Sequence, residues 1–215
     1  MQTPSDRATV KRLPERGTYD RDTINSILDE ALICHVAFDT DDGPVAIPTI
    51  HARIGTVLYL HGSPASRMLR STVESDVCVT ATIVDGIVVA RSAFHHSLNY
   101  RSVMVFGTPR VVLDRDERAC AFAAITNHVV PGRWDEARQP NEVEDKGTKL
   151  LAIDIDEASA KTRSGPPIDD EEDMDLDIWA GVIPLTVQAG DPIPAPDLEA
   201  GIETPASVRG LSDST

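Results

Sequence analysis

Short runs of apolar and β-branched residues, each closed by a turn signal, fill the middle of this chain of 215 residues. The runs cover residues 32–38, 45–54, 56–61, 76–84, 87–92, 99–114 and 150–156. Runs of this kind, interrupted by Gly, Pro, Asn and Asp, are typical of strands. Because helices do not alternate with them as in a parallel βαβ sheet, the sequence predicts an all-β core with added helices, arranged as a barrel.

Local signals predict the turns and helices around these strands. Asp85-Gly86 separates two β-branched runs, and an Asp-Gly pair in that position predicts a hairpin. Apolar residues recur at helical spacing from about Asp20, and further helices are expected over residues 63–75 and 115–129. No convincing strand is expected beyond the last of the apolar runs.

Composition divides the chain into three parts. Residues 1–17 are expected to form an N-terminal arm, and residues 18–185 the folded domain. Beyond Leu185 the content of Pro, Gly and Ser rises and the periodicity ends. Residues 186–215 are therefore expected to be a flexible C-terminal tail.

Charge and cysteine use narrow the class of partner. Asp and Glu number 35 against 20 Lys and Arg, a formal net charge of −15. Such a chain has no excess of cations for phosphates, so neither a nucleic-acid nor a membrane partner is expected. Cys34, Cys78 and Cys120 lie in separate apolar runs without a C-x-x-C pair, and we expect buried free thiols. Because no apolar signal sequence follows the N-terminal charges, a cytoplasmic protein is expected.

Common cofactor and catalytic motifs are missing from the sequence. It contains no G-x-G-x-x-G, no G-x-x-x-x-G-K-[ST], no H-E-x-x-H and no G-x-S-x-G. His95, His96 and His128 have no acidic or cysteine companions at a recognisable ligand spacing, so no metal site is expected. Any cofactor site must be built in another way.

The stretch after the third predicted strand has the features of an anion site. Gly62 permits a sharp turn, and Ser63 can cap a helix whose first residue is Pro64. The free N–H groups of that helix start, the hydroxyl of Ser66 and the guanidinium of Arg67 would together bind a phosphate. A well-capped surface helix accounts for the same residues equally well.

Pro48 interrupts a strand that otherwise looks buried. Proline cannot donate to a strand pairing, so Pro48 predicts a sheet edge or a bulge. An edge would leave backbone groups of Ile47, Thr49 and Ile50 free for a ligand such as a flavin ring. The alternative is an ordinary edge strand.

Polar residues also open the long run at residue 99. Asn99 and Arg101 share one face of a strand, and Tyr100 and Ser102 share the other. Polar groups at the start of an otherwise apolar strand suit a ligand at the mouth of a barrel, although a solvated strand end would look the same.

Cations gather in the segment that follows the last apolar run. Lys161 and Arg163 lie on one face of an extended segment in a chain short of positive charge, which indicates an anionic ligand. Alternatively, they balance the acidic run at residues 169–177. Trp179 follows, and it would either belong to the core or stack on an aromatic ring.

Taken together, these segments resemble the pyridoxamine 5′-phosphate oxidase-like, FMN-binding split-barrel family, in particular its flavin-nucleotide-binding, Nim-type (5-nitroimidazole resistance-like) branch. The similarity spans about residues 12–185. It is carried by residues 46–50, 58–69, 99–107, 131–138 and 160–185. The resemblance implies a six-stranded antiparallel split β-barrel that forms a homodimer, with two FMN sites at the subunit interface.

The resemblance also implies roles for the residues singled out above. The strand at residues 47–50 would line the isoalloxazine, and the turn at residues 61–67 would hold the ribityl phosphate. Residues 99–102 would add contacts from the partner subunit. The implied cofactor-binding residues are Ile47, Pro48, Thr49, Ile50, His61, Gly62, Ser63, Ser66, Arg67, Asn99, Tyr100, Arg101, Ser102, Lys161, Arg163 and Trp179.

His61 is the catalytic candidate, because it matches a histidine near the flavin in Nim-type proteins and a neutral imidazole can relay a proton. A purely structural role in the turn is the alternative. The chain lacks the arginine-rich C-terminal signature of true pyridoxamine phosphate oxidases, so oxidation of vitamin B6 is not expected.

The expected function is that of an FMN-dependent oxidoreductase that transfers hydride or electrons to a small organic substrate. Two alternatives remain open, a non-catalytic module that binds or sequesters flavin and a haem-handling split-barrel protein. The alternative cofactors are F420, FAD and haem.

Overall fold

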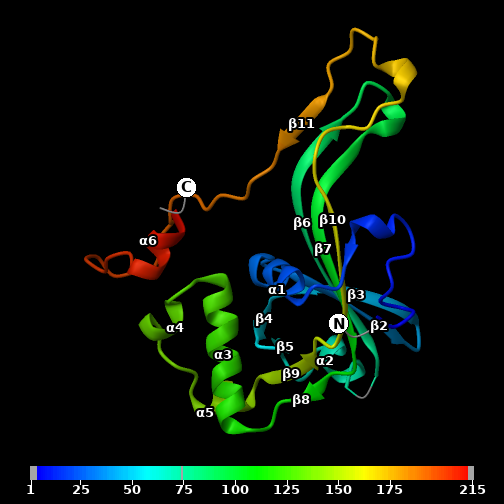
Figure 1. Cartoon of the computed structure of the whole chain (residues 1–215). Helices are drawn as coiled ribbons and strands as arrows, with labels where there is room; N and C mark the ends of the chain where they lie inside the picture. Colours follow the sequence, from blue (N-terminus) through cyan, green and yellow to red (C-terminus); the bar gives the residue numbers. More distant parts are fainter. Residues whose placement is uncertain (1–3, 74, 213–215) are drawn as a thin grey trace.

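The computed structural model describes residues 4–73 and 75–212, which fold into two antiparallel sheets with helices around them (Figure 1). The larger sheet has the order β1-β10-β7-β6-β2-β3, with β11 also paired to β6, and the smaller sheet has the order β4-β5-β9-β8. The strands of the larger sheet are β1 (Gly17–Thr18), β2 (Cys34–Thr40), β3 (Gly43–Thr49), β6 (Val77–Val89), β7 (Ser97–Gly107), β10 (Glu157–Arg163) and β11 (Gly181–Pro184). Those of the smaller sheet are β4 (His51–Ile54), β5 (Val57–Gly62), β8 (Arg110–Val111) and β9 (Lys149–Asp154).

Helices cover the ends and the outer face of these sheets. They are α1 (Arg21–Glu30), α2 (Arg67–Ser71), α3 (Arg115–Val129), α4 (Arg133–Glu136), α5 (Glu142–Lys146) and α6 (Ala206–Ser212), with the short 3-10 turns η1 (Pro14–Arg16), η2 (Ala93–His95) and η3 (Glu171–Asp173). Asp20 caps α1 by accepting from the Thr23 N–H, and Asp114 caps α3 in the same way from Glu117. Among the described residues, none of these helices is both long and apolar enough to span a bilayer.

The main core lies between the two sheets. Alternate residues of β5 point inward, so that Leu58 and Leu60 are fully buried against Val79 and Val103 of the larger sheet. Tyr59 points the other way, into a second cluster that α3 covers with Ala121 and Ile125. The predicted all-β core with added helices, in a split-barrel arrangement, is confirmed. The described residues form more strands than the predicted six, because short strands such as β1, β8 and β11 extend the sheets.

The hairpin predicted at Asp85-Gly86 is wrong. β6 runs straight through these residues as a single strand, and the register with β7 shifts between Val84 and Gly86 in a bulge. The chain reverses instead at η2. Pairing on both edges outweighs the local turn signal, because β7 and β11 flank this part of β6.

Other predicted runs were too long or incomplete. The run 45–54 is divided between β3 and β4, and the run 99–114 is divided between β7 and β8. Each run therefore contributes one strand to the larger sheet and one to the smaller sheet. β10 and β11 follow the strand that was expected to be last. They were not predicted as strands, because β10 includes the charged residues Glu157, Lys161 and Arg163, and β11 is short and contains Pro184.

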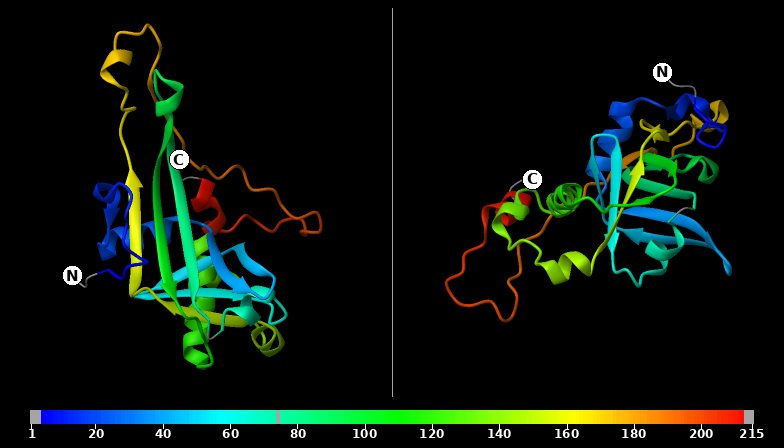
Figure 2. Two further views of the ribbon diagram at one scale, coloured as in Figure 1. Left: turned by 90° about the vertical axis from the view of Figure 1, so that its right-hand side faces the viewer. Right: turned by 90° about the horizontal axis from the view of Figure 1, so that it is seen from below.

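The outer half of the β6–β7 hairpin stands away from the barrel (Figures 1 and 2). Residues 84–99 and 163–184 form this projection, which we call the distal arm. Several of its apolar side chains remain exposed, with relative exposures of 40% for Val84, 38% for Ile87 and 44% for Leu98, whereas Val88 and Ala90 are buried. A single chain therefore leaves the apolar surface of the distal arm uncovered.

Both predicted terminal segments contact the folded domain where the structure describes them. Arg7 bridges Asp76 at 2.7 Å and Glu157 at 2.8 Å, which ties the predicted N-terminal arm to the barrel. In the predicted tail, α6 lies beside α4, and the Ser207 N–H donates to Glu136 at 3.2 Å. Residues 1–3 and 213–215 lie outside the described residues.

The three cysteines are free thiols, but they are not all buried. Cys34 is buried, and desolvation raises the pKa of its thiol to about 12. Cys78 is partly buried, and Cys120 lies on the exposed side of α3. The prediction of burial is therefore wrong for Cys120, which sits in an apolar run but on the solvent face of its helix.

Candidate functional site

Two of the predicted ligand segments meet at one end of the smaller sheet. β3 is the edge strand of its sheet, as Pro48 predicts, and only Ile50 separates it from β4. His51 of β4 pairs with Leu60 of β5, so Ile50 and His61 occupy neighbouring strand ends. We call residues 47–50 and 61–67 the turn site.

The helix of the turn site begins later than predicted. α2 starts at Arg67 with Ser66 as its N-cap, whereas Pro64 and Ala65 form a turn. Ser63 stabilises that turn, because its carbonyl accepts from the Ser66 N–H at 2.8 Å and its hydroxyl from the Ala65 N–H at 3.2 Å. With only five residues, α2 contributes a weak dipole, so side chains must carry most of any anion binding.

Ser66 and Arg67 have polar side chains without a partner in the turn site. Among the described residues, neither side chain makes a hydrogen bond or an ion pair. Arg7, Arg53 and Arg101 pair with carboxylates, whereas Arg67, like Arg70 on the same helix, forms no salt bridge among the described residues. Arg67 therefore remains available for a ligand anion, which its planar fork can bind with two hydrogen bonds.

His61 adds a buried polar atom without a partner. Its Nδ1 is shielded from solvent and has no hydrogen-bond partner within the described part of the chain. Burial lowers the pKa of His61, so its imidazole is neutral at pH 7. A buried polar atom without a partner costs roughly 1–3 kcal/mol, which a hydrogen-bonding ligand at this position would recover. The donor set of the turn site thus fits an anionic, hydrogen-bonding cofactor such as a flavin nucleotide.

The remaining predicted residues lie elsewhere, on β7, on β10 and, for Trp179, in the segment before β11. Ser102 pairs with Lys161 and Tyr100 with Arg163 across the two strands. We call residues 99–102, 161 and 163 the arm site. Trp179 lies apart from them, because it precedes β11, which pairs with the other edge of β6. In the larger sheet, β2, β6 and β7 lie between β3 and β10, so one chain does not bring the turn site and the arm site together.

Two cations of the arm site already have partners in the protein. Arg101 donates to Asp85 at 2.7 Å and also pairs with Glu30, and it lowers the pKa of the Glu30 carboxyl. Lys161 donates to the Arg12 carbonyl at 2.7 Å and holds the N-terminal segment in place. These contacts leave both side chains fewer donors for a ligand.

Arg163 differs because all its partners are neutral. Its guanidinium donates to Asn99 Oδ1, to the Gly165 carbonyl at 3.3 Å and to the Pro166 carbonyl at 3.1 Å. Burial and the nearby charge of Arg16 lower the pKa of Arg163. No carboxylate among the described residues pairs with either arginine.

Trp179 is 66% exposed, in the loop between β10 and β11, so it does not belong to the core. It lies on the same distal arm as Phe94, which is 88% exposed. Both aromatic rings are therefore accessible to a ligand or to a second chain.

Sequence reasoning missed part of a small pocket next to the arm site. Its volume is about 200 Å³, and its lining residues are Arg16, Phe94, His95, His96, Ser97, Arg163 and Ile168. The adjacent histidines beside an exposed Phe were a possible signal. They gave no prediction of a site, because the cations that share the pocket with them, Arg16 and Arg163, lie far away in sequence.

His95 has acidic neighbours in space that no ligand spacing in the sequence indicates. Its Nε2 lies 3.0 Å from Asp170, which raises the pKa of His95, and Asp173 also lies near. These carboxylates come from η3 and its N-cap, far along the chain. His128, in contrast, contacts the Ala31 carbonyl at 2.9 Å and serves packing at the end of α1.

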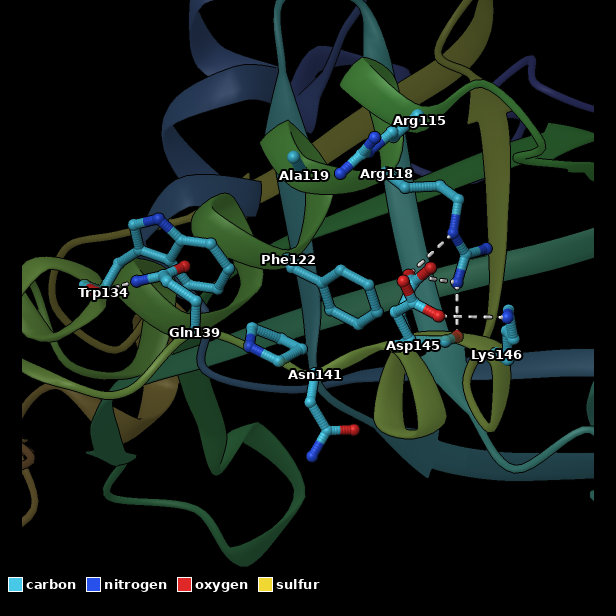
Figure 3. Close-up of a pocket in the computed structure, with 11 residues that line it drawn as sticks. Arg115, Arg118, Ala119, Phe122, Trp134, Gln139, Asn141, Asp145 and Lys146 are labelled. Carbon is cyan, nitrogen blue, oxygen red and sulfur yellow. Dashed lines mark hydrogen bonds and ion pairs between the residues drawn. The ribbon is translucent and has the colours of Figure 1, made fainter.

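A separate pocket of about 410 Å³ lies between α3, α4 and α5 (Figure 3). Phe122 and Trp134 form apolar walls, while Arg118 donates to Asp145 at 2.8 Å. Because many of its polar groups bond other groups of the protein, this pocket offers a ligand few free donors. It lies on the outer face of the smaller sheet, away from both predicted sites.

The sequence and fold together identify the class of protein. The sequence profile of the pyridoxamine 5′-phosphate oxidase family matches residues 20–162, and the chain belongs to this family. The predicted family resemblance is thereby confirmed. No curated protein sequence matches the chain.

Two solved structures are similar over nearly the whole length. The flavocytochrome Anf3 from Azotobacter vinelandii is 36% identical, with a TM-score of 0.92 and coverage of 98% of this chain and 99% of that chain. The FAD and heme binding protein from Mycobacterium smegmatis is 40% identical, with a TM-score of 0.87 and coverage of 91% and 97%.

A third structure shares the fold alone. It is a Bacteroides thetaiotaomicron protein named for 5-nitroimidazole antibiotic resistance, 22% identical, with a TM-score of 0.56 and coverage of 67% of this chain and 85% of that chain.

Proposed function

We propose that this protein is a flavin-dependent oxidoreductase that binds the flavin phosphate at the turn site and transfers electrons to a small organic substrate. The observation that carries this proposal is the set of unpartnered groups at the end of β5. Arg67 and Ser66 lack partners among the described residues, and the buried Nδ1 of His61 lies at the same strand end. A phosphate and a flavin ring would supply the missing partners.

The flavin that we favour is FAD, with FMN as the alternative. The Mycobacterium smegmatis relative is named for FAD binding, and it is 40% identical to this chain. The turn site itself does not discriminate, because both flavins carry a phosphate on the ribityl chain.

A homodimer would complete the site. The turn site and the arm site are separated within one sheet, and the distal arm leaves Val84, Ile87 and Leu98 exposed. Contiguous apolar surface of this kind is typical of subunit interfaces. A two-fold arrangement would bring the arm site of one chain to the turn site of the other, and would cover the apolar residues.

The residues of the turn site would have separate tasks. Arg67 and Ser66 would bind the phosphate, while His61, neutral because it is buried, would hold or move one proton at its Nδ1. The bound flavin would supply the redox chemistry, and the protein would supply orientation and electrostatics. If His61 only fixes the turn, the protein is a non-catalytic module that binds or sequesters flavin.

A second cofactor is favoured by the same relatives. One is a flavocytochrome and the other is named for FAD and heme binding, and both cover more than nine-tenths of this chain. We therefore also propose that the protein binds haem, in addition to the flavin.

Flavin binding is tested by loading the purified protein with FAD or FMN, desalting it and recording the visible spectrum. We expect flavin bands to remain, and Arg67→Ala to weaken affinity about 10- to 100-fold, as for a lost charged hydrogen bond. Arg70→Ala is the matched control, because Arg70 is exposed on the same helix. Equal affinities for the two variants, or a protein that binds neither flavin, would refute the proposal.

Turnover separates the enzyme from the binding module. The loaded protein is reduced and then mixed with an organic electron acceptor, and wild type is compared with His61→Gln. A slower reoxidation by the variant, at unchanged flavin content, would support a catalytic His61.

A further inference from the structure

His96 lies in the small pocket beside the arm site, and the protein holds its ring by one nitrogen only. The Nδ1 of His96 lies 3.0 Å from the Ser92 carbonyl. A carbonyl can only accept, so Nδ1 carries the proton and Nε2 keeps its lone pair. Metal-binding histidines in proteins almost always donate their other N–H to a carbonyl or carboxylate in this way. Among the described residues, Nε2 of His96 has no partner.

Two cations without a carboxylate partner border the same pocket. Arg163 is only 8% exposed and donates to neutral acceptors, and Arg16 lies near enough to lower its pKa. Two neighbouring arginines in so acidic a chain are electrostatically unfavourable without an anion. A ligand with two carboxylates would balance them.

Apolar groups complete the chemistry of this surface. Phe94 is 88% exposed and Ile168 is 71% exposed, and both line the pocket. The pocket therefore offers an imidazole nitrogen, two guanidinium groups and two apolar side chains. Haem matches this set, since it has an iron that prefers imidazole, two propionates and an apolar macrocycle.

The other histidines match less well. His51 is fully buried, with its Nε2 2.8 Å from the Leu28 carbonyl, and the Nε2 of His128 contacts the Ala31 carbonyl. The Nε2 of His95 contacts Asp170. His61 belongs to the turn site. His35 is exposed on β2, where it does not line the pocket that Arg16 and Arg163 share.

We infer that His96 binds the iron of a haem through Nε2, with Arg16 and Arg163 binding the propionates. This inference rests on the proposed haem function. The pocket of one chain, at about 200 Å³, is smaller than the roughly 300–1,000 Å³ of complete small-molecule sites. The second chain of the proposed homodimer therefore forms the opposite wall.

The test uses the full chain, titrated with hemin and followed by its Soret absorption and by electron paramagnetic resonance of the ferric state. His96→Gly should weaken hemin affinity at least about tenfold, and added imidazole should restore the wild-type spectrum. His35→Gly, treated identically, is the matched control and should resemble wild type. Arg16→Gln and Arg163→Lys should each weaken hemin binding and leave the spectrum of the saturated protein unchanged.

Failure of this inference is distinguishable from failure of the proposed haem function. Wild type that binds no hemin would overturn both. Wild type that binds hemin with a spectrum unchanged in His96→Gly would overturn the inference alone. A His96→Gly or Arg16→Gln variant that loses FAD instead of hemin would also overturn it, and would assign the pocket to the anionic part of the flavin nucleotide.

Discussion

The inner and outer halves of the β6–β7 hairpin have similar sequences and opposite environments. In the barrel, Val79, Val103 and Val105 have no exposed surface, whereas Val84, Ile87 and Leu98 of the distal arm are about two-fifths exposed. Strand pairing continues through both halves. The difference lies in what packs against the faces of the ribbon, because the smaller sheet and α1 complete the core of the barrel only. In the distal arm Val88 and Ala90 are buried, but they belong to neither of the two core clusters.

The largest effect should come from removing one leucine in each region. Leu58→Ala, in the barrel core, should lower the free energy of unfolding by about 2–5 kcal/mol, because it leaves a cavity in a packed interior. Leu98→Ala, in the distal arm, should cost less than about 1 kcal/mol, since Leu98 is 44% exposed. Urea denaturation of dilute protein measures both values. Similar losses for the two variants would show that the distal arm is buried in solution.

Lowering the pH should also act on the barrel, through His51. Burial holds the pKa of His51 at about 4, below the ordinary value of 6.5. The unfolded chain therefore takes up this proton first, and the stabilising contribution of neutral His51 is full above pH 6.5 and lost progressively toward pH 4. The loss is about 3 kcal/mol. His51→Gln should flatten stability over this range, whereas the exposed-site control His35→Gln should keep the wild-type slope.

A smaller effect is expected where the distal arm joins the barrel. Arg101 bridges Glu30 of α1 and Asp85 of β6. Arg101→Gln should cost about 1 kcal/mol, since the carboxylates are partly exposed and solvent screens them. Thermal unfolding with and without 0.5 M salt measures this contribution. The added salt shortens the range of charge–charge interactions roughly fivefold relative to dilute buffer. An Arg101→Gln variant as salt-sensitive as wild type would contradict the assignment.

The smallest effect is expected in the distal arm, at His95. Its contribution to stability falls as the pH rises, whereas that of His51 falls as the pH drops. Asp170 raises the pKa of His95, so this contact contributes below the ordinary histidine pKa and is lost as the pH rises through the raised value. NMR titration of the imidazole should show a pKa above that of the same residue in Asp170→Asn. Identical titrations would mean that η3 does not lie against His95 in solution.

The sequence predicted the barrel well because its signals are local. Leu58 and Leu60 alternate with Tyr59 in one strand, and Asp20 and Asp114 start helices where such residues commonly do. The bulge near Gly86 was not predictable in this way, because β11 arrives from about 95 positions later in the chain, where Gly181 pairs with Val89.

The candidate site was partly predictable for the same reason. Arg67 and His61 come from one continuous segment, so their proximity follows from the sequence. Arg101, in contrast, was expected to contact a ligand, but it meets Glu30, which lies 71 positions earlier. The contact between His96 Nδ1 and the Ser92 carbonyl could not be predicted from the sequence either, because it depends on where the chain reverses between β6 and β7.

The pairing of β11 with β6 has a consequence for the behaviour of the protein in concentrated solution. β2 covers β6 only as far as Thr80, and without β11 the stretch from Ile87 to Val89 would present an unpaired edge of β-branched residues. Such edges promote strand-to-strand aggregation. Gly86 permits the close approach, since a Cβ there would lie 3.0 Å from the Ile183 carbonyl oxygen. A side chain at position 86 would therefore weaken the pairing of β11 and expose the edge of β6. We expect it to reduce solubility during expression and storage more than it affects folding.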